Sequence, residues 1–378
     1  MSLIVDEHRL YLDDALRLET FAKAIAATVR PGDVVVDLGT GTGLLAFFAC
    51  RAGARHVYAI ELSGLVEIAR ELAIANGFGD RITFLHQHSF EAELPEAADV
   101  LVADLVGGMG FEAGLFPTYA DARRFLKPGA RTVPKTLTLA AAPVEAPELF
   151  NEVQFWSRGF AGLDSEPVLK WARNTGYPRL LEPSAALSSE SISAVTDPLG
   201  GARLIRLQGS STIERDGILH GIGGWFDAEL APGVKLTNAP RAEVRLNRRN
   251  VFLPLDVAVP VSRGDRVETH LRIRPFDKLV SWDVTVHTAT AVIRERHSTL
   301  DGMLLSREER QSHRPGSIPR LTKRGEARRS VLELCDGHRT LEAIEREVQA
   351  RHPDLFPAFG EAQAFVAEVV ARYSEPGA

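Results

Sequence analysis

Residues 34–61 read VVVDLGTGTGLLAFFACRAGARHVYAIE, and this stretch constrains the fold more than any other part of the chain. A run of β-branched residues ends in Asp37, and a turn with three glycines follows. An apolar segment then leads to a second strand-like run, which ends in Glu61. A strand, a glycine-rich turn and a helix in this order are typical of a Rossmann-like unit that binds a nucleotide-like cofactor.

The same alternation continues through a first predicted domain, residues 1–133. Strand-like and helical patterns alternate here, which predicts a parallel sheet with helices on both faces. The strands are expected at 34–39, 56–61, 81–87 and 99–105, and the helices at 15–29, 44–52, 63–76 and 113–126. We read LKPGA (126–130) as the end of the last helix, because it contains Pro and Gly.

A second domain is predicted at residues 134–306, where short alternating segments are separated by turn residues. This pattern favours an antiparallel β-barrel or sandwich, with a helical insertion at 147–164. A polar stretch at 307–320 reads as a linker, and a helical module completes a third region, 307–378. Its helices are expected at 321–335, 340–350 and 361–373, with Gly337 at a helix end and Thr340 at an N-cap.

Composition excludes several classes of protein. The formal net charge of −6 leaves no basic field for nucleic acid. The N-terminal MSLIVDEHRLYLDD has no apolar core of the kind that signal peptides contain, and the chain has no stretch of about 18 apolar residues. We therefore expect neither a signal peptide nor a membrane span. The two cysteines, Cys50 and Cys335, lie far apart without a C-x-x-C motif, so we expect no disulfide and no metal site, and a cytoplasmic location.

The glycine turn reads Asp37-x-Gly39-x-Gly41-Thr42-Gly43. This spacing differs from the G-x-G-x-x-G of dinucleotide sites, and an acid directly before the glycines would repel a pyrophosphate. An acid there suits a ligand that carries an ammonium and no phosphate, and Glu61 is placed to accept hydrogen bonds from a ribose diol. These properties indicate S-adenosylmethionine. The alternative is a plain tight turn with a chance acid.

Three segments resemble the protein arginine N-methyltransferases: HRLYLDDALRLETFAKAI, LKPGARTVPKTLTLAAAPVE and FWSRGFAGLD. The resemblance covers roughly residues 5–300 and is more specific in the first half. It implies a class I methyltransferase domain followed by a β-barrel. It also implies transfer of a methyl group to nitrogen and a homodimer that forms through an arm at 155–164.

The resemblance also implies roles for single residues. Arg17 would bind the carboxylate of the methionine moiety, although an arginine on a helix surface commonly faces solvent. His8 and Tyr11 would lie near the transferred methyl, or serve only as a surface histidine and a packed tyrosine. The remaining cofactor-binding residues would be Asp37, Gly39, Gly41 and Gly43 at the amino end, Glu61 at the ribose, and Ser89 and Phe90 near the adenine.

The acceptor site departs from the family. The family has two glutamates in a loop that reads VADLVGGMGFEAGLF here, at 102–116. Asp104 stands at the first position, and Glu112 stands at the second only if one residue is deleted. Both are candidate catalytic residues that bind a cationic acceptor or take its proton. The alternatives are a strand-end acid and a helix-start acid. Gly107, Gly108 and Gly110 predict a more flexible loop.

A second departure falls near 241–250. The family's Thr-His-Trp loop is replaced by RAEVRLNRRN, which contains four arginines. Positive charge beside the pocket would disfavour arginine as the acceptor. A primary amine fits the shorter Asp104 at least as well.

The tail, LTKRGEARRSVLELCDGHRTLEAIEREV (321–348), resembles PqqD-like modules, which are winged-helix elements that bind leader peptides in ribosomal peptide natural-product pathways. The resemblance implies a leader peptide bound at 321–373, with GMLLS (302–306) as a candidate part of the module's hairpin. The alternative is a plain helical cap.

These observations predict an S-adenosylmethionine-dependent N-methyltransferase that acts on a peptide or protein amine, with ribosomal peptide biosynthesis as the candidate pathway. The alternatives are a protein arginine N-methyltransferase, a small-molecule methyltransferase and a non-catalytic scaffold that binds S-adenosylmethionine.

Overall fold

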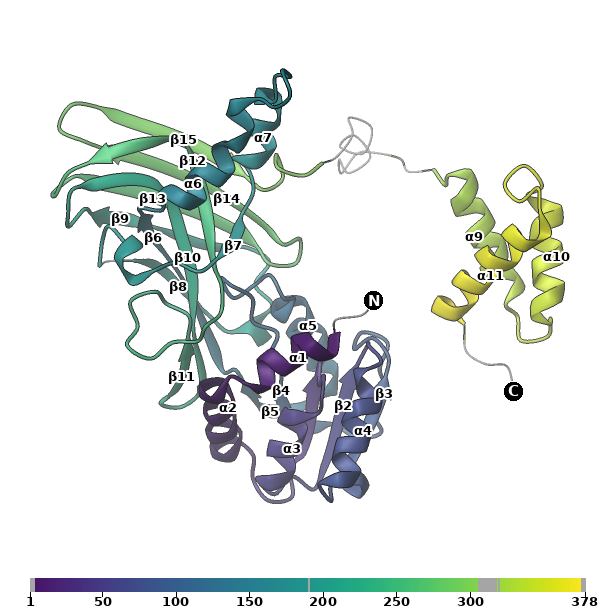
Figure 1. Cartoon of the computed structure of the whole chain (residues 1–378). Helices are drawn as coiled ribbons and strands as arrows, with labels where there is room; N and C mark the ends of the chain where they lie inside the picture. The colour runs from purple at the N-terminus through teal and green to yellow at the C-terminus, as the bar shows by residue number, and fades with distance from the viewer. Residues whose placement is uncertain (1–3, 190, 305–317, 319, 375–378) are drawn as a thin grey trace. The chain divides into compact units, whose positions relative to one another are not determined.

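The computed structural model describes residues 4–189, 191–304, 318 and 320–374. The chain divides into two compact units, Met1–Met303 and Leu304–Ala378, and each is described by itself (Figure 1). In the first unit, a parallel sheet with its helices is followed by two antiparallel sheets. The junction of the two parts falls between β5 and β6, after Val133.

The parallel sheet has the strand order β3-β2-β1-β4-β5. All five residues of β1 are buried, as expected for a parallel strand that is covered on both faces. The order reverses between β1 and β4, and ligands of such sheets bind outside the carboxyl ends of the strands at that point. The elements are α1 (Ile4–Leu12), α2 (Ala15–Thr28), β1 (Val34–Leu38), α3 (Leu44–Arg51), β2 (His56–Glu61), α4 (Leu65–Ala75), β3 (Ile82–His86), β4 (Ala98–Val102), α5 (Leu115–Ala122) and β5 (Leu126–Val133).

The sequence reading of LKPGA as a helix end was wrong. Helix α5 ends at Ala122, and these residues begin the edge strand β5. The register of β5 against β4 shifts between Ala98 and Val100, opposite the Pro128–Gly129 segment. An edge strand with an irregular register tolerates a proline, which the composition signal could not distinguish from a helix end.

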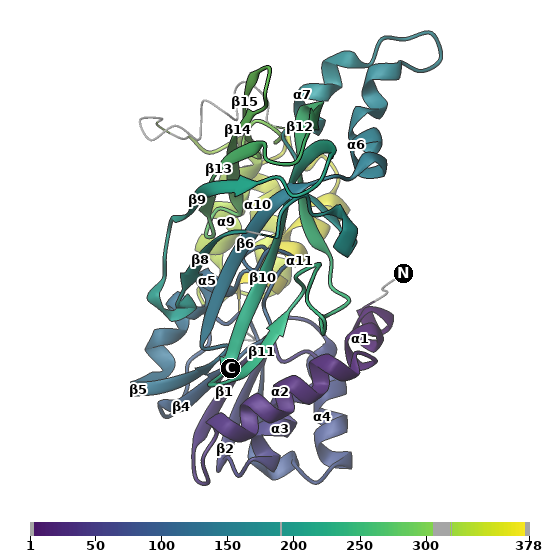
Figure 2. The same ribbon diagram turned by 90° about the vertical axis from the view of Figure 1, so that its left-hand side faces the viewer.

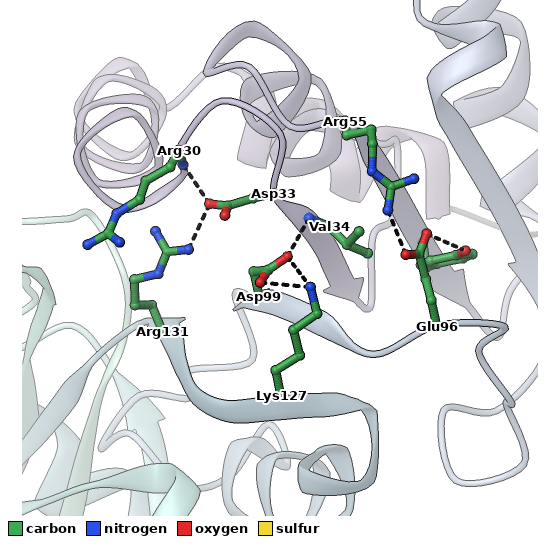
Figure 3. Close-up of polar contacts among 9 residues, drawn as sticks. Arg30, Asp33, Val34, Arg55, Glu96, Asp99, Lys127 and Arg131 are labelled. Atoms are coloured by element: carbon green, nitrogen blue, oxygen red, sulfur yellow. Dashed lines mark hydrogen bonds and ion pairs between the residues drawn. The ribbon is translucent and has the colours of Figure 1, made fainter.

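Ion pairs join the strands at the amino edge of the sheet, opposite the carboxyl ends (Figure 3). Asp99 of β4 accepts hydrogen bonds from the backbone N–H of Val34 at 2.9 Å and from Lys127 Nζ at 2.8 Å. Arg131 of β5 pairs with Asp33 at 2.8 Å. This edge therefore has a structural role, and the carboxyl edge is left for ligands.

The antiparallel part has two sheets, with orders β7-β12-β10-β6-β8 and β15-β14-β13-β9, and β11 pairs with β10. Burial alternates along β13 and β14, as expected for strands with one face in a core. By strand pairing among the described residues, the predicted barrel consists of two antiparallel sheets that share one hydrophobic core. The strands are β6 (Thr136–Val144), β7 (Tyr177–Arg179), β8 (Ile192–Thr196), β9 (Ile205–Thr212), β10 (Gly217–Ala231), β11 (Val234–Thr237), β12 (Asn250–Val261), β13 (Arg266–Arg274), β14 (Leu279–His287) and β15 (Val292–Ser298).

The predicted helical insertion forms an arm that projects from the antiparallel sheets in both ribbon views (Figures 1 and 2). It contains α6 (Pro147–Val153), two 3₁₀ segments and α7 (Leu169–Ala172), so it extends beyond the predicted 147–164. Phe155, Phe160 and Leu163 expose about half or more of their surface on this arm. Helix α2 lies between α3 and strands β10 and β11, and thus links the two parts of the unit.

The second unit contains α9 (Lys323–Leu334), α10 (Leu341–Arg351) and α11 (Phe359–Tyr373) around its own core. The predicted N-cap is confirmed, because Thr340 accepts the backbone N–H of Ala343. Helix α9 ends at Leu334 with Cys335 as its cap, so Gly337, which adopts a positive φ, lies in the following turn. Among residues 318 and 320–374, helices are the only regular elements, so a winged helix is not seen there. Part of the GMLLS segment lies outside the described residues.

The part of the chain that the structure describes contains no helix long and apolar enough to span a membrane.

Candidate functional site

The glycine turn lies at the carboxyl end of β1. Gly39, Gly41 and Gly43 have φ values of +69°, +54° and +86°, a conformation that favours glycine. A Cβ atom on Gly41 would lie 2.6 Å from His8 Cε1, so the imidazole of α1 covers the turn closely. The turn therefore requires glycine both for its backbone and for this contact.

Asp37 is fully buried beneath the turn. Its Oδ2 accepts hydrogen bonds from Thr40 Oγ1 at 2.5 Å and from the Ala46 N–H at 3.1 Å, whereas Oδ1 has no hydrogen-bond partner. Burial raises the pKa of Asp37 to about 7, although the bonds from Thr40 and Ala46 lower it. An ammonium beside Oδ1 would satisfy this oxygen and stabilise the carboxylate.

Glu61 ends β2 and connects it to the turn. Its Oε2 accepts the Gly41 N–H at 2.9 Å, and its Oε1 accepts the Ser63 N–H at 2.8 Å. The side chain is half-buried, and each oxygen keeps a lone pair for a ribose hydroxyl. Glu61 is thus oriented before any ligand arrives.

Ser89 and Phe90 follow β3 at the same edge of the sheet. The carbonyl oxygen of Ser89 accepts a hydrogen bond from Arg124 at 2.7 Å, which fixes the segment. The ring of Phe90 is half exposed and contacts the His88 ring at 4.7 Å between centroids. An exposed ring offers an apolar face for an adenine. The carboxylate oxygens of Asp37 and Glu61 and the ring of Phe90 at this edge therefore fit S-adenosylmethionine.

Asp104 follows β4, directly across the strand-order reversal from the glycine turn. Its Oδ2 accepts a hydrogen bond from Arg17 Nε at 2.6 Å, and Arg248 approaches both oxygens at 3.2 and 3.3 Å. Burial raises the pKa of Asp104, but the positive charges of Arg248 and Arg17 lower it by more. The net shift of the pKa is therefore downward. Arg17 thus contacts Asp104 here, and its role at a cofactor carboxylate stays a prediction.

Glu112 occupies a different hydrogen-bond network. Its carboxylate accepts the N–H groups of Met109 at 3.0 Å and Phe111 at 3.1 Å. Burial raises its pKa, although these backbone bonds lower it. Glu112 therefore organises residues 103–114, which we call the acceptor loop.

The glycines of the acceptor loop allow close packing, which the prediction of a flexible loop did not consider. A Cβ on Gly107 would lie 2.2 Å from Glu112 Oε2, and one on Gly108 would lie 2.7 Å from the carbonyl oxygen of Arg249. Both glycines allow close packing, and Gly110 adopts a positive φ. Within the loop, Ala113 is the one exposed residue, and the others are buried or half-buried.

His8 and Tyr11 lie near this site. Their rings contact edge-to-face at 5.5 Å between centroids. The carbonyl oxygen of Tyr11 accepts a hydrogen bond from Arg17 Nη1 at 3.1 Å. The structure thus brings both residues to the glycine turn and Arg17, and their role at the methyl group stays a prediction.

Sequence reasoning missed three residues that join the antiparallel sheets to the acceptor loop. Arg248 also donates to the carbonyl oxygen of Val106 at 2.8 Å. Buried Asn238 donates to the carbonyl oxygen of Gly108 at 2.7 Å, and buried Asn250 donates to that of Asn238 at 2.7 Å. The arginine-rich stretch was a usable signal for Arg248, whereas single asparagines carried none.

A separate polar cluster lies in the antiparallel sheets, where ligand atoms of Asp256, Glu295 and His297 lie within 4.8 Å of one another. Glu295 already accepts the Asp256 N–H at 2.6 Å and contacts His297 Nε2 at 3.1 Å. The cluster is thus an internal hydrogen-bond network.

The chain is similar to known proteins over much of its length. Residues 19–130 match the family model of ribosomal protein L11 methyltransferase (PrmA). The chain is 30% identical over 239 residues to a probable protein arginine N-methyltransferase 6 of Arabidopsis thaliana, covering 59% of this chain and 54% of that protein. It is 30% identical over 292 residues to the histone-arginine methyltransferase CARMER of Drosophila persimilis, covering 73% and 55%. The chain thus spans about half the length of these curated relatives.

Solved structures have the same fold. A Trypanosoma brucei PRMT1 enzyme–prozyme heterotetrameric complex with AdoHcy superposes with a TM-score of 0.69 at 20% identity, covering 77% of this chain and 97% of that one. Protein arginine methyltransferase 10 of Arabidopsis thaliana gives 0.65 at 20% identity, covering 76% and 96%.

The fold and the residues at the carboxyl edge have the features of class I S-adenosylmethionine-dependent methyltransferases. Over the matched span, the chain is similar to protein arginine N-methyltransferases.

Proposed function

We propose that the chain transfers a methyl group from S-adenosylmethionine to a guanidinium nitrogen of an arginine in a protein or peptide. One observation carries this proposal. The buried, unpartnered Oδ1 of Asp37 lies at the glycine turn, and buried Asp104 follows the adjacent parallel strand. The arginine methyltransferases among the relatives favour a guanidinium as the acceptor.

The residues divide into two functions. Asp37 would bind the cofactor's ammonium and Glu61 its ribose, which orients the reactive end of the molecule. Bound S-adenosylmethionine supplies an electrophilic methyl group. Asp104, whose pKa is lowered, would bind the cationic acceptor as a carboxylate. Glu112, which the backbone N–H groups of Met109 and Phe111 hold in the same loop, would take the proton.

A labelled-methyl assay on two peptide sets tests the proposal. One set carries arginine in a glycine-rich context with a blocked terminus, and the other carries primary amines without arginine. Label on the arginine set supports the proposal, and label on the amine set alone contradicts it. Silence on both sets, with binding of S-adenosylhomocysteine intact, would indicate a small-molecule acceptor or a non-catalytic scaffold.

A second candidate acceptor is the amine of a peptide that is held by its leader at residues 321–373. The C-terminal unit has its own hydrophobic core, which supports a separate role for it. Tethering there would raise the effective concentration of the peptide at the active site. Removal of residues 320–378 should then abolish methylation of the full-length precursor peptide and leave S-adenosylhomocysteine affinity unchanged.

We further propose a homodimer that forms through the arm, because Phe155, Phe160 and Leu163 expose apolar surface there. Sedimentation of the full chain and of a Phe160→Ser, Leu163→Ser variant tests this, and a monomeric wild type contradicts it. A cytoplasmic location is proposed because the two free cysteines lie in different units.

A further inference from the structure

Asp104, which the proposed function assigns to the acceptor, already binds a guanidinium group of its own chain. Arg248 places Nη1 3.3 Å from Asp104 Oδ1 and Nη2 3.2 Å from Asp104 Oδ2. This is the two-pronged arrangement by which a carboxylate binds a guanidinium ligand. Arg17 uses Oδ2 as well, at 2.6 Å. One carboxylate therefore faces two cations of its own chain.

The pair is largely removed from solvent, since the side chains of Arg248 and Asp104 are 19% and 9% exposed. Burial lowers the pKa of Arg248, but the negative charge of Asp104 raises it by more. Both groups therefore carry their charges at neutral pH. A third guanidinium at Asp104 would meet two like charges in a poorly screened site. An arginine substrate could not simply be added to this arrangement.

The backbone around Arg248 is held by residues other than Arg248 itself. Arg248 belongs to an irregular segment between β11 and β12 whose flanks are fixed by buried Asn238 and Asn250. Its two contacts with Asp104 are longer than that of Arg17, and its displacement must also break the 2.8 Å hydrogen bond to the Val106 carbonyl oxygen. The charge of Asp14 also raises the pKa of Arg248, so a second carboxylate contributes to the field around this guanidinium. Rotation of one side chain therefore frees one face of Asp104.

The geometry points to Arg248 as an internal occupant of the acceptor site, which an incoming guanidinium must displace from Asp104. The inference rests on the proposed function, since it takes Asp104 as the acceptor acid. Arg248 is then the residue that determines how readily arginine is accepted: it weakens the binding of every guanidinium and leaves the cofactor edge unchanged.

Binding and turnover separate this inference from the proposed function. The full chain, saturated with S-adenosylhomocysteine, is titrated calorimetrically with an arginine peptide, and kcat and KM are measured separately with S-adenosylmethionine. Arg248→Gln should bind the peptide about tenfold more tightly than wild type, with a matching fall in KM. Arg249→Gln is the matched control, because its exposed side chain precedes β12 without contacting Asp104 in any described hydrogen bond or ion pair. It should behave as wild type.

Arg248→Lys keeps the positive charge but loses the two-pronged guanidinium contact with Asp104. The affinity of this variant for the arginine peptide should therefore lie between those of wild type and Arg248→Gln. Unchanged S-adenosylhomocysteine affinity shows that each variant is folded. Equal or weaker peptide binding by folded Arg248→Gln and Arg248→Lys overturns the inference, even if wild type methylates arginine. Tighter binding without methylation by any variant supports the inference and contradicts the proposed function.

Discussion

Two buried acids, Asp37 and Asp104, follow from adjacent parallel strands, yet their pKa values shift in opposite directions. Burial raises both. Asp37 has only neutral donors, Thr40 and Ala46, and one of its oxygens has no partner. Asp104 has two guanidinium groups that more than offset the effect of burial. The cofactor region is thus built to receive a cation, whereas the acceptor region already contains two.

The largest expected effect comes from Asp104→Asn. It leaves Arg17 and Arg248 without their shared counter-charge, so the free energy of unfolding should fall by about 3–5 kcal/mol. Methyl transfer should fall by about 100-fold or more, because the acceptor loses its ionic partner. Thermal unfolding and single-turnover rates measure both. Wild-type turnover in this variant would place the acceptor site elsewhere.

The next effect tests the cofactor region. Glu61→Ala should weaken S-adenosylhomocysteine binding by roughly tenfold or more, since a charge-assisted hydrogen bond contributes about 1.5–3 kcal/mol. Glu67→Ala is the matched control, because Glu67 is an exposed acid of α4 in a 3.7 Å ion pair with Arg70. Calorimetry should separate the two variants, and equal affinities would remove Glu61 from the ribose site.

The pH dependence of cofactor binding sharpens the comparison. With the pKa of Asp37 at about 7, the carboxylate is mostly protonated at pH 6 and mostly ionised at pH 8. S-Adenosylhomocysteine affinity should therefore be about tenfold weaker at pH 6 than at pH 8. Asp37→Asn should bind weakly at both pH values. A pH-independent affinity in the wild type would exclude an ionic role for Asp37.

The same shift has a consequence for stability. A raised folded-state pKa means that the native state binds more protons than the unfolded chain between the two pKa values. The contribution of Asp37 to the free energy of unfolding is therefore present below about pH 4 and is lost as the pH rises through about 7. Asp37→Asn should remove this loss in the ligand-free protein, as measured by denaturant unfolding. A wild-type slope in that variant would assign the titration to another group.

The smallest effect is expected from a third acid, at the opposite edge of the sheet. Asp99→Asn loses a partly exposed ion pair with Lys127, so stability should fall by about 0.5–1 kcal/mol. Cofactor affinity and turnover should not change, because the amino edge of the sheet has no part in the site (Figure 3). A change in cofactor affinity or turnover would contradict the assignment of the amino edge to stability and the carboxyl edge to ligand binding.

The sequence by itself determined the cofactor region, because its contacts are local in the chain. Asp37 reaches Thr40 and Ala46 at sequence separations of 3 and 9, and Glu61 reaches Gly41 at 20. Strand, turn and helix bring these groups together by their own geometry. Spacing and residue type were therefore enough to predict the elements, the glycine turn and the kind of ligand it fits. The edge strand β5 was missed because its proline and glycine have the same composition as a helix end.

Only the tertiary structure decided the acceptor region. Asp104 meets Arg17 and Arg248 across sequence separations of 87 and 144, and Asn238 meets Gly108 across 130. Such contacts depend on how the antiparallel sheets pack on the parallel sheet, and no local pattern encodes that. The sequence placed four arginines near the pocket, but only packing selects Arg248 for Asp104, because its side chain alone among the four reaches that carboxylate in the described ion pairs.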